Sequence, residues 1–155
     1  QESRGLGDVY KRQHLESLGV RMERHCANAL KVAQWLSADP RVSWVSFPGL
    51  EGDKYHALAE KYMPNGTCGV ISFGVPGGRE KVSAFLDHLK MVSIATHVAD
   101  ARSCTLYPAG TTHRQLTEEQ LIEAGVGIDL VRLCCGIENA DDIIADLDQA
   151  LAAVQ

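Results

Sequence analysis

One arginine stands in the middle of an apolar segment near the C-terminus, LVRLCC at residues 130–135. The surrounding residues predict a short buried strand over 129–135. A guanidinium keeps its charge inside a protein, so Arg132 needs a polar or anionic partner. Its planar fork of donors can hold a carboxylate through two hydrogen bonds. The alternative is an internal salt bridge to Asp100 or Glu138, and the residues alone favour neither.

The second candidate is a polar stretch, THVADARSCTLYPAGTTHRQL, at residues 96–116. Loops held by a rigid scaffold often carry binding groups. A binding segment and a solvated hairpin explain this composition equally well. The side chains that could donate or accept hydrogen bonds here are Thr96, His97, Asp100, Arg102, Ser103, Thr111, Thr112, His113 and Arg114.

Other patterns that could support chemistry are weak. The glycine-rich turn GVPGGRE at residues 74–80 lacks the lysine of a P-loop and the G-x-G-x-x-G spacing, so we expect a plain turn. The six histidines show no metal-ligand spacing, and we expect no metal site. The five cysteines are odd in number and have no C-x-x-C motif, which favours free thiols in a reducing compartment.

Composition limits the remaining classes of function. The chain has 155 residues, 45% of them hydrophobic, as expected for one globular domain. Its net charge of −5 argues against a nucleic-acid partner. The apolar runs are too short to span a bilayer, and no secretion signal opens the chain. We therefore expect a cytoplasmic protein with no membrane partner.

Regular elements begin at residue 14. The first 13 residues, QESRGLGDVYKRQ, are polar and aperiodic and look like translated adaptor sequence, so we expect residues 1–13 to be a non-native head and residues 14–155 to be the domain. Helices and strands alternate after it, which predicts an α/β or α+β layer with a mostly antiparallel sheet and helices on one face. Strands are expected over 42–47, 67–75, 91–98, 103–107 and 129–135; helices over 14–39, 53–63, 79–90 and 117–124, and after Asn139.

Two segments, at residues 96–120 and 127–151, resemble the C-terminal domain of the Cys/Met-metabolism family of PLP-dependent enzymes. Within it, KYMPNGTCGVISFGVPGG at 61–78 and PAGTTHRQL at 108–116 are most similar to the O-acetylhomoserine sulfhydrylase subgroup. The resemblance implies the small C-terminal domain of a fold-type I PLP transferase. Its parent would make homocysteine or methionine from O-acetylhomoserine and sulfide or a thiol. Cystathionine synthases and lyases and methionine γ-lyase are alternatives within the family, and a non-catalytic amino-acid-binding module is an alternative outside it.

The resemblance also implies the roles of residues. Arg132 matches the family's arginine that binds the substrate's α-carboxylate, and Thr96 and His97 are secondary candidates for the same site. The Schiff-base lysine and the groups that bind pyridoxal 5'-phosphate would lie in a preceding domain, so we expect no catalytic and no cofactor-binding residue in this chain, and a parent that forms a dimer or tetramer. The sequence departs from the family pattern at Cys134–Cys135, Ala99 and Gly110, where Ser-Val, Gly and Ser are usual.

Overall fold

The computed structural model describes residues 2–154. Five strands form one sheet in the order β1-β2-β5-β4-β3. Neighbouring strands are antiparallel, except that β3 runs parallel to β4 at one edge. Strand β5 is central and pairs along its whole length with β2. The strands are β1 (Val45–Ser46), β2 (Val70–Gly74), β3 (Ser93–Ile94), β4 (Cys104–Leu106) and β5 (Leu130–Cys134).

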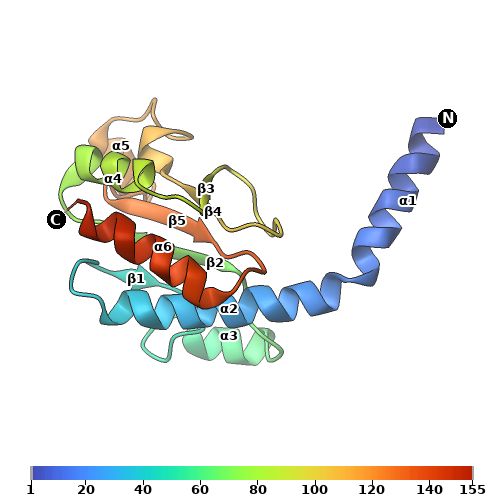
Figure 1. The fold of residues 1–155 in the computed structure, drawn as a ribbon. Coiled ribbons are helices and arrows are strands. Elements are labelled where there is room, and N and C mark those ends of the chain that lie inside the picture. The colour runs from blue at the N-terminus through green and yellow to red at the C-terminus, as the bar shows by residue number, and fades with distance from the viewer. Residues whose placement is uncertain (1, 155) are drawn as a thin grey trace.

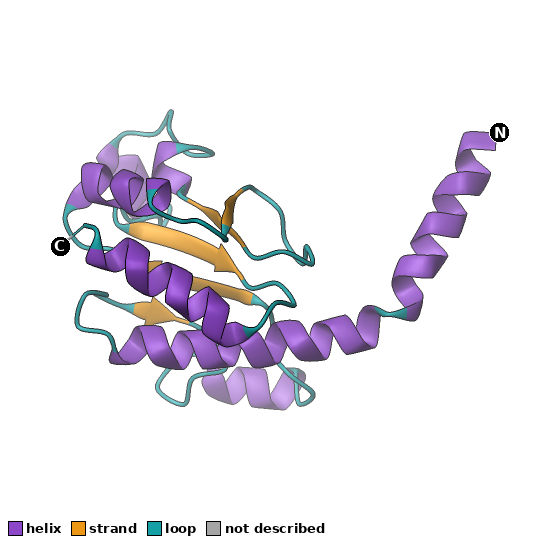
Figure 2. Ribbon diagram, viewed as in Figure 1, coloured by secondary structure: helices purple, strands orange, loops and turns teal. Residues whose placement is uncertain are grey.

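Helices α2 and α6 lie side by side across one face of the sheet (Figures 1 and 2). Alternation along the strands explains this layer, because successive side chains point to opposite faces. Val131 and Leu133 of β5 are fully buried in the core that the helices cover. The helices are α1 (Glu2–Glu16), α2 (Leu18–Ala38), α3 (His56–Tyr62), α4 (Gly78–Asp87), α5 (Glu118–Glu123) and α6 (Ala140–Ala152), with a 3-10 turn η1 (Pro108–Gly110).

The predicted fold class is confirmed, and most elements occur where the sequence predicts them, although each strand is shorter. The strand expected over 91–98 is reduced to Ser93–Ile94, because the polar residues after it turn away to form a loop. At the N-terminus, the aperiodic residues form helix α1, which projects away from the sheet and ends beside the start of α2 (Figure 1). Arg21 of α2 joins the two helices by donating to the carbonyl of His14 at 2.7 Å.

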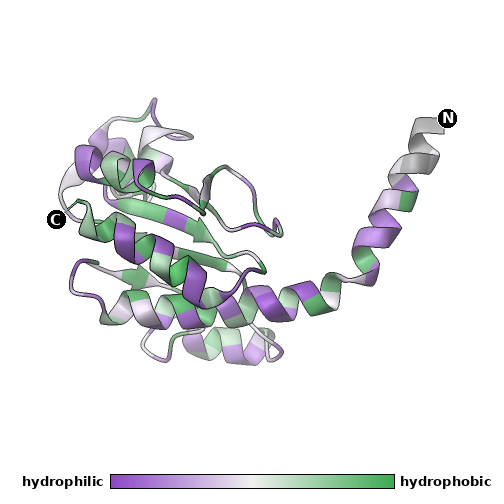
Figure 3. Ribbon diagram, in the orientation of Figure 1, coloured by the Kyte–Doolittle hydropathy of each residue, from purple (hydrophilic) through white to green (hydrophobic). Residues whose placement is uncertain are grey.

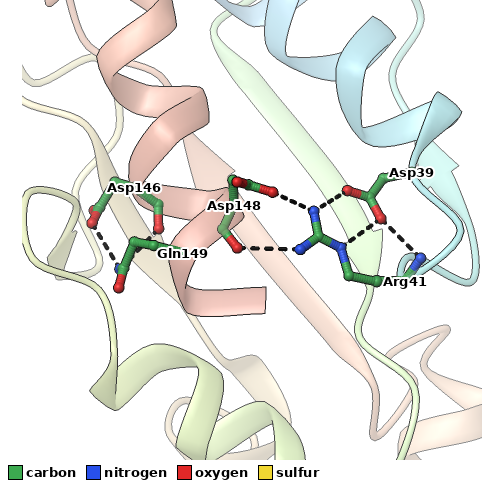
Figure 4. A network of polar contacts seen from close by, with 5 residues as sticks. All are labelled: Asp39, Arg41, Asp146, Asp148 and Gln149. Carbon is green, nitrogen blue, oxygen red and sulfur yellow. Dashed lines mark hydrogen bonds and ion pairs between the residues drawn. The ribbon is translucent and has the colours of Figure 1, made fainter. Parts of the chain in front are cut away.

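Two aspartates of α6 fasten this helix to neighbouring loops, and Figure 4 shows the contact of Asp148 with Arg41. Asp148 forms an ion pair with Arg41, which also pairs with Asp39 at the end of α2. Asp146 is buried and accepts the main-chain N–H groups of residues 90, 91 and 92 at 2.8–2.9 Å. The Asp146 contacts hold the chain that leads into β3, and the Asp148 contact holds the segment between α2 and β1.

Candidate functional site

Arg132 lies at the centre of β5, on the opposite side of the strand from Val131 and Leu133. Figure 3 shows β5 as a hydrophobic strand with one hydrophilic interruption in its middle, where the sequence has Arg132. In the sheet register its neighbours are Ser72 of β2 and Leu106 of β4. The guanidinium therefore rises from the middle of the sheet face that does not carry the main core.

The guanidinium is held by main-chain carbonyls. Its Nη2 donates to the carbonyl of Thr96 at 3.1 Å, and the carbonyl of His97 lies 3.5 Å away. The Nε atom is buried and has no hydrogen-bond partner in the structure. A buried donor without an acceptor costs free energy. Arg132 thus has a full charge and unused donors, as a site for a bound carboxylate requires.

The alternative of an internal salt bridge is wrong for the described residues. One Asp100 oxygen lies 3.1 Å from Nδ1 of His97, and the other accepts the N–H of Arg102 at 3.0 Å. Glu138 binds Ser103 instead, through both of its carboxylate oxygens. Within residues 2–154, no carboxylate forms an ion pair with Arg132.

Thr96 and His97 lie in the loop that follows β3, and this loop brings both residues to Arg132. Their side chains are exposed, so it is their carbonyls that contact the guanidinium. The loop turns at Ala99, whose φ of 59° is the only positive value at a non-glycine residue in the described part of the chain. Hydrogen bonds from Arg102 and His97 lower the pKa of Asp100, which therefore stays ionised and fixes the turn.

Two thiols lie beside the site. Cys104 and Cys134 are direct cross-strand partners on β4 and β5, and the thiol of Cys104 donates to the carbonyl of His97 at 3.2 Å. Burial raises the pKa of Cys104 to about 11 and also raises that of Cys134. Both thiols are therefore protonated at neutral pH, and neither is an activated nucleophile.

The remaining polar candidates are not gathered at Arg132. The hydroxyl of Thr111 donates to the carbonyl of Tyr107, and the hydroxyl of Thr112 lies 2.9 Å from Nδ1 of His113. Thr111, Thr112 and His113 belong to the turn after η1. A hollow of about 600 Å³ lies between α2 and α3, and none of the predicted site residues lines it. In residues 2–154, no group of three or more His, Cys, Asp or Glu side chains could hold a metal ion, and no helix could cross a membrane.

Sequence reasoning missed two features of this site. The carbonyls of Thr96 and His97 carry no residue-type signal, because every residue has one. Ser72, the register partner of Arg132, also went unnoticed because strand pairing is not visible in one sequence. The nearest available signal was Ala99, where the family pattern has a glycine and the structure has a positive φ.

The lysines lie at the surface of the described part of the chain. All six are exposed and none lies on a strand of the sheet that carries Arg132. Within residues 2–154, the strands around Arg132 therefore carry no lysine that could form a Schiff base with pyridoxal 5'-phosphate, and the assignment of this chain to the substrate carboxylate and not to the cofactor stays a prediction. The lysines are Lys11, Lys31, Lys54, Lys61, Lys81 and Lys90.

Comparisons with known proteins agree with this architecture. A homocysteine synthase of Schizosaccharomyces pombe is 50% identical over 139 residues, and an O-acetyl-L-homoserine sulfhydrylase of Leptospira meyeri is 47% identical over 140. Each match covers 90% of this chain, but the chain spans only 32% of either relative. A crystal structure from Campylobacter jejuni, described as an O-acetylhomoserine (thiol)-lyase with a pyridoxyl-lysine group, superposes with a TM-score of 0.84 at 40% identity, covering 90% of this chain and 33% of that one.

The sequence profile described as "Cys/Met metabolism PLP-dependent enzyme" matches residues 10–152. This match includes residues 10–13, the last four residues of the head. The non-native origin of residues 1–13 stays a prediction. Because the profile covers nearly the whole chain, the chain belongs to the family of Cys/Met-metabolism PLP-dependent enzymes.

Proposed function

We propose that this chain supplies the α-carboxylate site of a PLP-dependent O-acetylhomoserine sulfhydrylase, with Arg132 as the carboxylate ligand. The observation that carries the proposal is the guanidinium itself, which has a buried, unpartnered Nε and no ion-pair partner among residues 2–154. A carboxylate supplies the opposite charge that Arg132 lacks among these residues. Thr96 and His97 would form the adjacent wall of the site.

The proposed parent enzyme replaces the acetate of O-acetylhomoserine with sulfide, giving homocysteine, or with a thiol, giving the corresponding thioether. Pyridoxal 5'-phosphate would supply the electron-withdrawing chemistry from the part of the parent outside this chain. The contribution of this chain is positional. Fixing the carboxylate restricts the rotation and tilt of the bound amino acid, and such orientation accounts for a large share of many enzymatic rate enhancements.

A hybrid enzyme tests the proposal. Residues 14–155 would replace the matching third of the Leptospira meyeri relative, and homocysteine formation from O-acetylhomoserine and sulfide would be measured. We expect an active hybrid in which Arg132→Ala raises KM for O-acetylhomoserine about tenfold or more, because one charge-assisted hydrogen bond contributes about 1.5–3 kcal/mol. Arg114→Ala, in the turn after η1, is the matched control and should leave KM unchanged.

Two results would contradict the proposal. Unchanged kinetics of Arg132→Ala in an active hybrid would remove Arg132 from the substrate site. Elimination to a keto acid and ammonia without incorporation of sulfide would instead identify the γ-lyase alternative, which uses the same arginine.

We also propose that the parent is cytoplasmic and forms a homo-oligomer, a dimer or a tetramer. All five cysteines are free thiols, which suits a reducing compartment. Exposed apolar side chains near the start of α2, including Leu18 and Val20, offer surface for contacts with other subunits. Light scattering of the purified hybrid would give its mass, and a monomer would contradict the oligomer proposal.

A further inference from the structure

Ser103 immediately precedes β4 and is completely buried. Its main-chain N–H donates to one oxygen of Glu138 at 2.6 Å, and its hydroxyl donates to the other at 3.0 Å. The same hydroxyl accepts the N–H of Gly136 at 2.8 Å. Ser103 is therefore bound from two directions by the turn that follows β5, the strand of Arg132.

This turn is itself fixed on both sides. Asn28 of α2 donates its amide to the carbonyls of Gly136 and Glu138 at 2.9 and 2.8 Å. The N–H of Ile137 donates to the carbonyl of Ala101 at 2.9 Å. A Cβ atom at position 136 would come within 2.5 Å of the Ala101 carbonyl, so only glycine permits so close an approach. We call Asn28, Ser103, Gly136 and Glu138 the Glu138 clamp.

Hydrogen bonds connect the Glu138 clamp to the loop that holds Arg132. The Ser103 carbonyl accepts the N–H of Ser93, and the carbonyl of Thr105 on β4 accepts the N–H of Ala95. These two bonds set the end of β3, and Thr96 follows at once with the carbonyl that binds Nη2 of Arg132. A shift of Ser103 would therefore move the acceptors of the guanidinium.

From this geometry we infer that Glu138 is a positioning residue, which fixes the guanidinium of Arg132 through Ser103 and the loop of residues 96–103. The inference rests on the proposed function for its consequence, since the positioned group is the proposed carboxylate ligand. Positioning and electrostatics predict opposite effects of removing Glu138 on carboxylate binding. Glu138 carries a negative charge near an anion site, so by electrostatics its removal should strengthen carboxylate binding, whereas by positioning its removal should weaken it.

The experiment uses the whole 155-residue chain, labelled with ¹⁵N. The Nε–H resonance of Arg132 is assigned from its disappearance in Arg132→Lys, and its exchange with solvent is measured without ligand. L-Methionine is then titrated, with 3-(methylthio)propylamine as the matched probe that lacks the carboxylate. The variants are Glu138→Ala and Glu138→Gln, and Glu123→Ala, at an exposed position on α5, is the charge-matched control.

We expect faster Nε–H exchange in Glu138→Ala than in the wild type, and binding of L-methionine about three- to tenfold weaker. Glu138→Gln keeps one oxygen as an acceptor for the Ser103 N–H. This variant should therefore keep most of the protection of Nε–H from exchange and most of the affinity for L-methionine. Ser103→Ala, which loses only the hydroxyl bonds, should lie between them and replaces Glu138→Ala if that variant does not fold. Glu123→Ala should match the wild type.

Equal exchange rates in the wild type, Glu138→Ala and Ser103→Ala would overturn the positioning role, as would tighter binding of L-methionine in folded Glu138→Ala. The two proposals fail separately. If L-methionine leaves the wild-type Arg132 resonance unmoved, the carboxylate function fails, while the exchange comparison without ligand still decides whether Glu138 positions the guanidinium.

Discussion

The carboxylate of Asp146 should be one of the main polar contributors to the stability of this fold. It accepts the N–H groups of Lys90, Met91 and Val92, and its Oδ1 also lies 3.2 Å from the amide of Gln149. Asp146→Asn removes the charge and turns an NH₂ group towards N–H donors. Hydrogen bonds to a charged group contribute about 1.5–3 kcal/mol each, and the asparagine oxygen still accepts some of the N–H groups that the carboxylate accepts. We therefore expect a loss of about 2–3 kcal/mol in the free energy of unfolding.

The pH dependence gives this prediction a second readout. Burial alone would raise the pKa of Asp146, but the N–H groups of residues 92, 90 and 91 outweigh burial and lower it. A carboxyl whose pKa is lower in the folded state stabilises the fold above its unfolded pKa of about 3.9. This stabilisation is lost as the pH falls through the folded pKa. The difference between the wild type and Asp146→Asn should therefore stay constant from pH 7 to 5 and shrink below about pH 4.

Urea unfolding at pH 7, 5 and 3, followed by circular dichroism, measures both effects, and the midpoint of thermal unfolding at pH 7 should fall by roughly 5–10 °C. Asp87→Asn, at an exposed position at the end of α4, makes the same charge change and should alter stability by less than about 0.5 kcal/mol. A loss of under about 1 kcal/mol at pH 7, or an equal loss at pH 7 and pH 3, would refute this reasoning.

Three further predictions follow from other residues. Ala99→Gly should raise the free energy of unfolding by about 0.5–1 kcal/mol in urea titrations, because φ is 59° there; a destabilised variant would contradict this. Gly136→Ala should lower it by about 2–3 kcal/mol, since its Cβ would lie 2.5 Å from the N–H nitrogen of Ser103, and a neutral result would show that the turn can relax. Cys104 and Cys134 should resist a thiol reagent at pH 7.5 until urea unfolds the chain; rapid native labelling located by mass spectrometry would show that burial does not suppress their thiolates.

Periodic segments of the sequence predict the layer well. The spacing of Ala29, Val32, Ala33 and Leu36 reflects the buried face of α2, and the capping box at Thr117 forms as the sequence indicates. Element ends are less predictable because they depend on where tertiary partners stop. The strand expected over 91–98 ends at Ile94 because the chain then leaves the edge of the sheet to form the loop that contacts Arg132.

The candidate site was predictable in part. An arginine in an apolar strand already indicates a charge that needs a partner, and the structure places Thr96 and His97 beside it. The kind of contact was not predictable, since main-chain carbonyls meet the guanidinium through a loop fixed by distant hydrogen bonds. Glu138 illustrates this limit. As a salt-bridge partner of Arg132 it was a reasonable candidate, but Ser103, buried just before β4, donates hydrogen bonds to both of its oxygens.

The most direct test of the carboxylate site is isothermal titration calorimetry of the chain with L-methionine and with 3-(methylthio)propylamine, which differ by the carboxylate alone. We predict measurable binding of L-methionine, none of the amine at the same concentration, and a tenfold or greater loss of affinity for L-methionine in Arg132→Gln, as expected for one charge-assisted pair of about 1.5–3 kcal/mol. Equal binding of both compounds, or an Arg132→Gln variant that binds L-methionine as tightly as the wild type, would contradict the assignment of Arg132 as the carboxylate ligand.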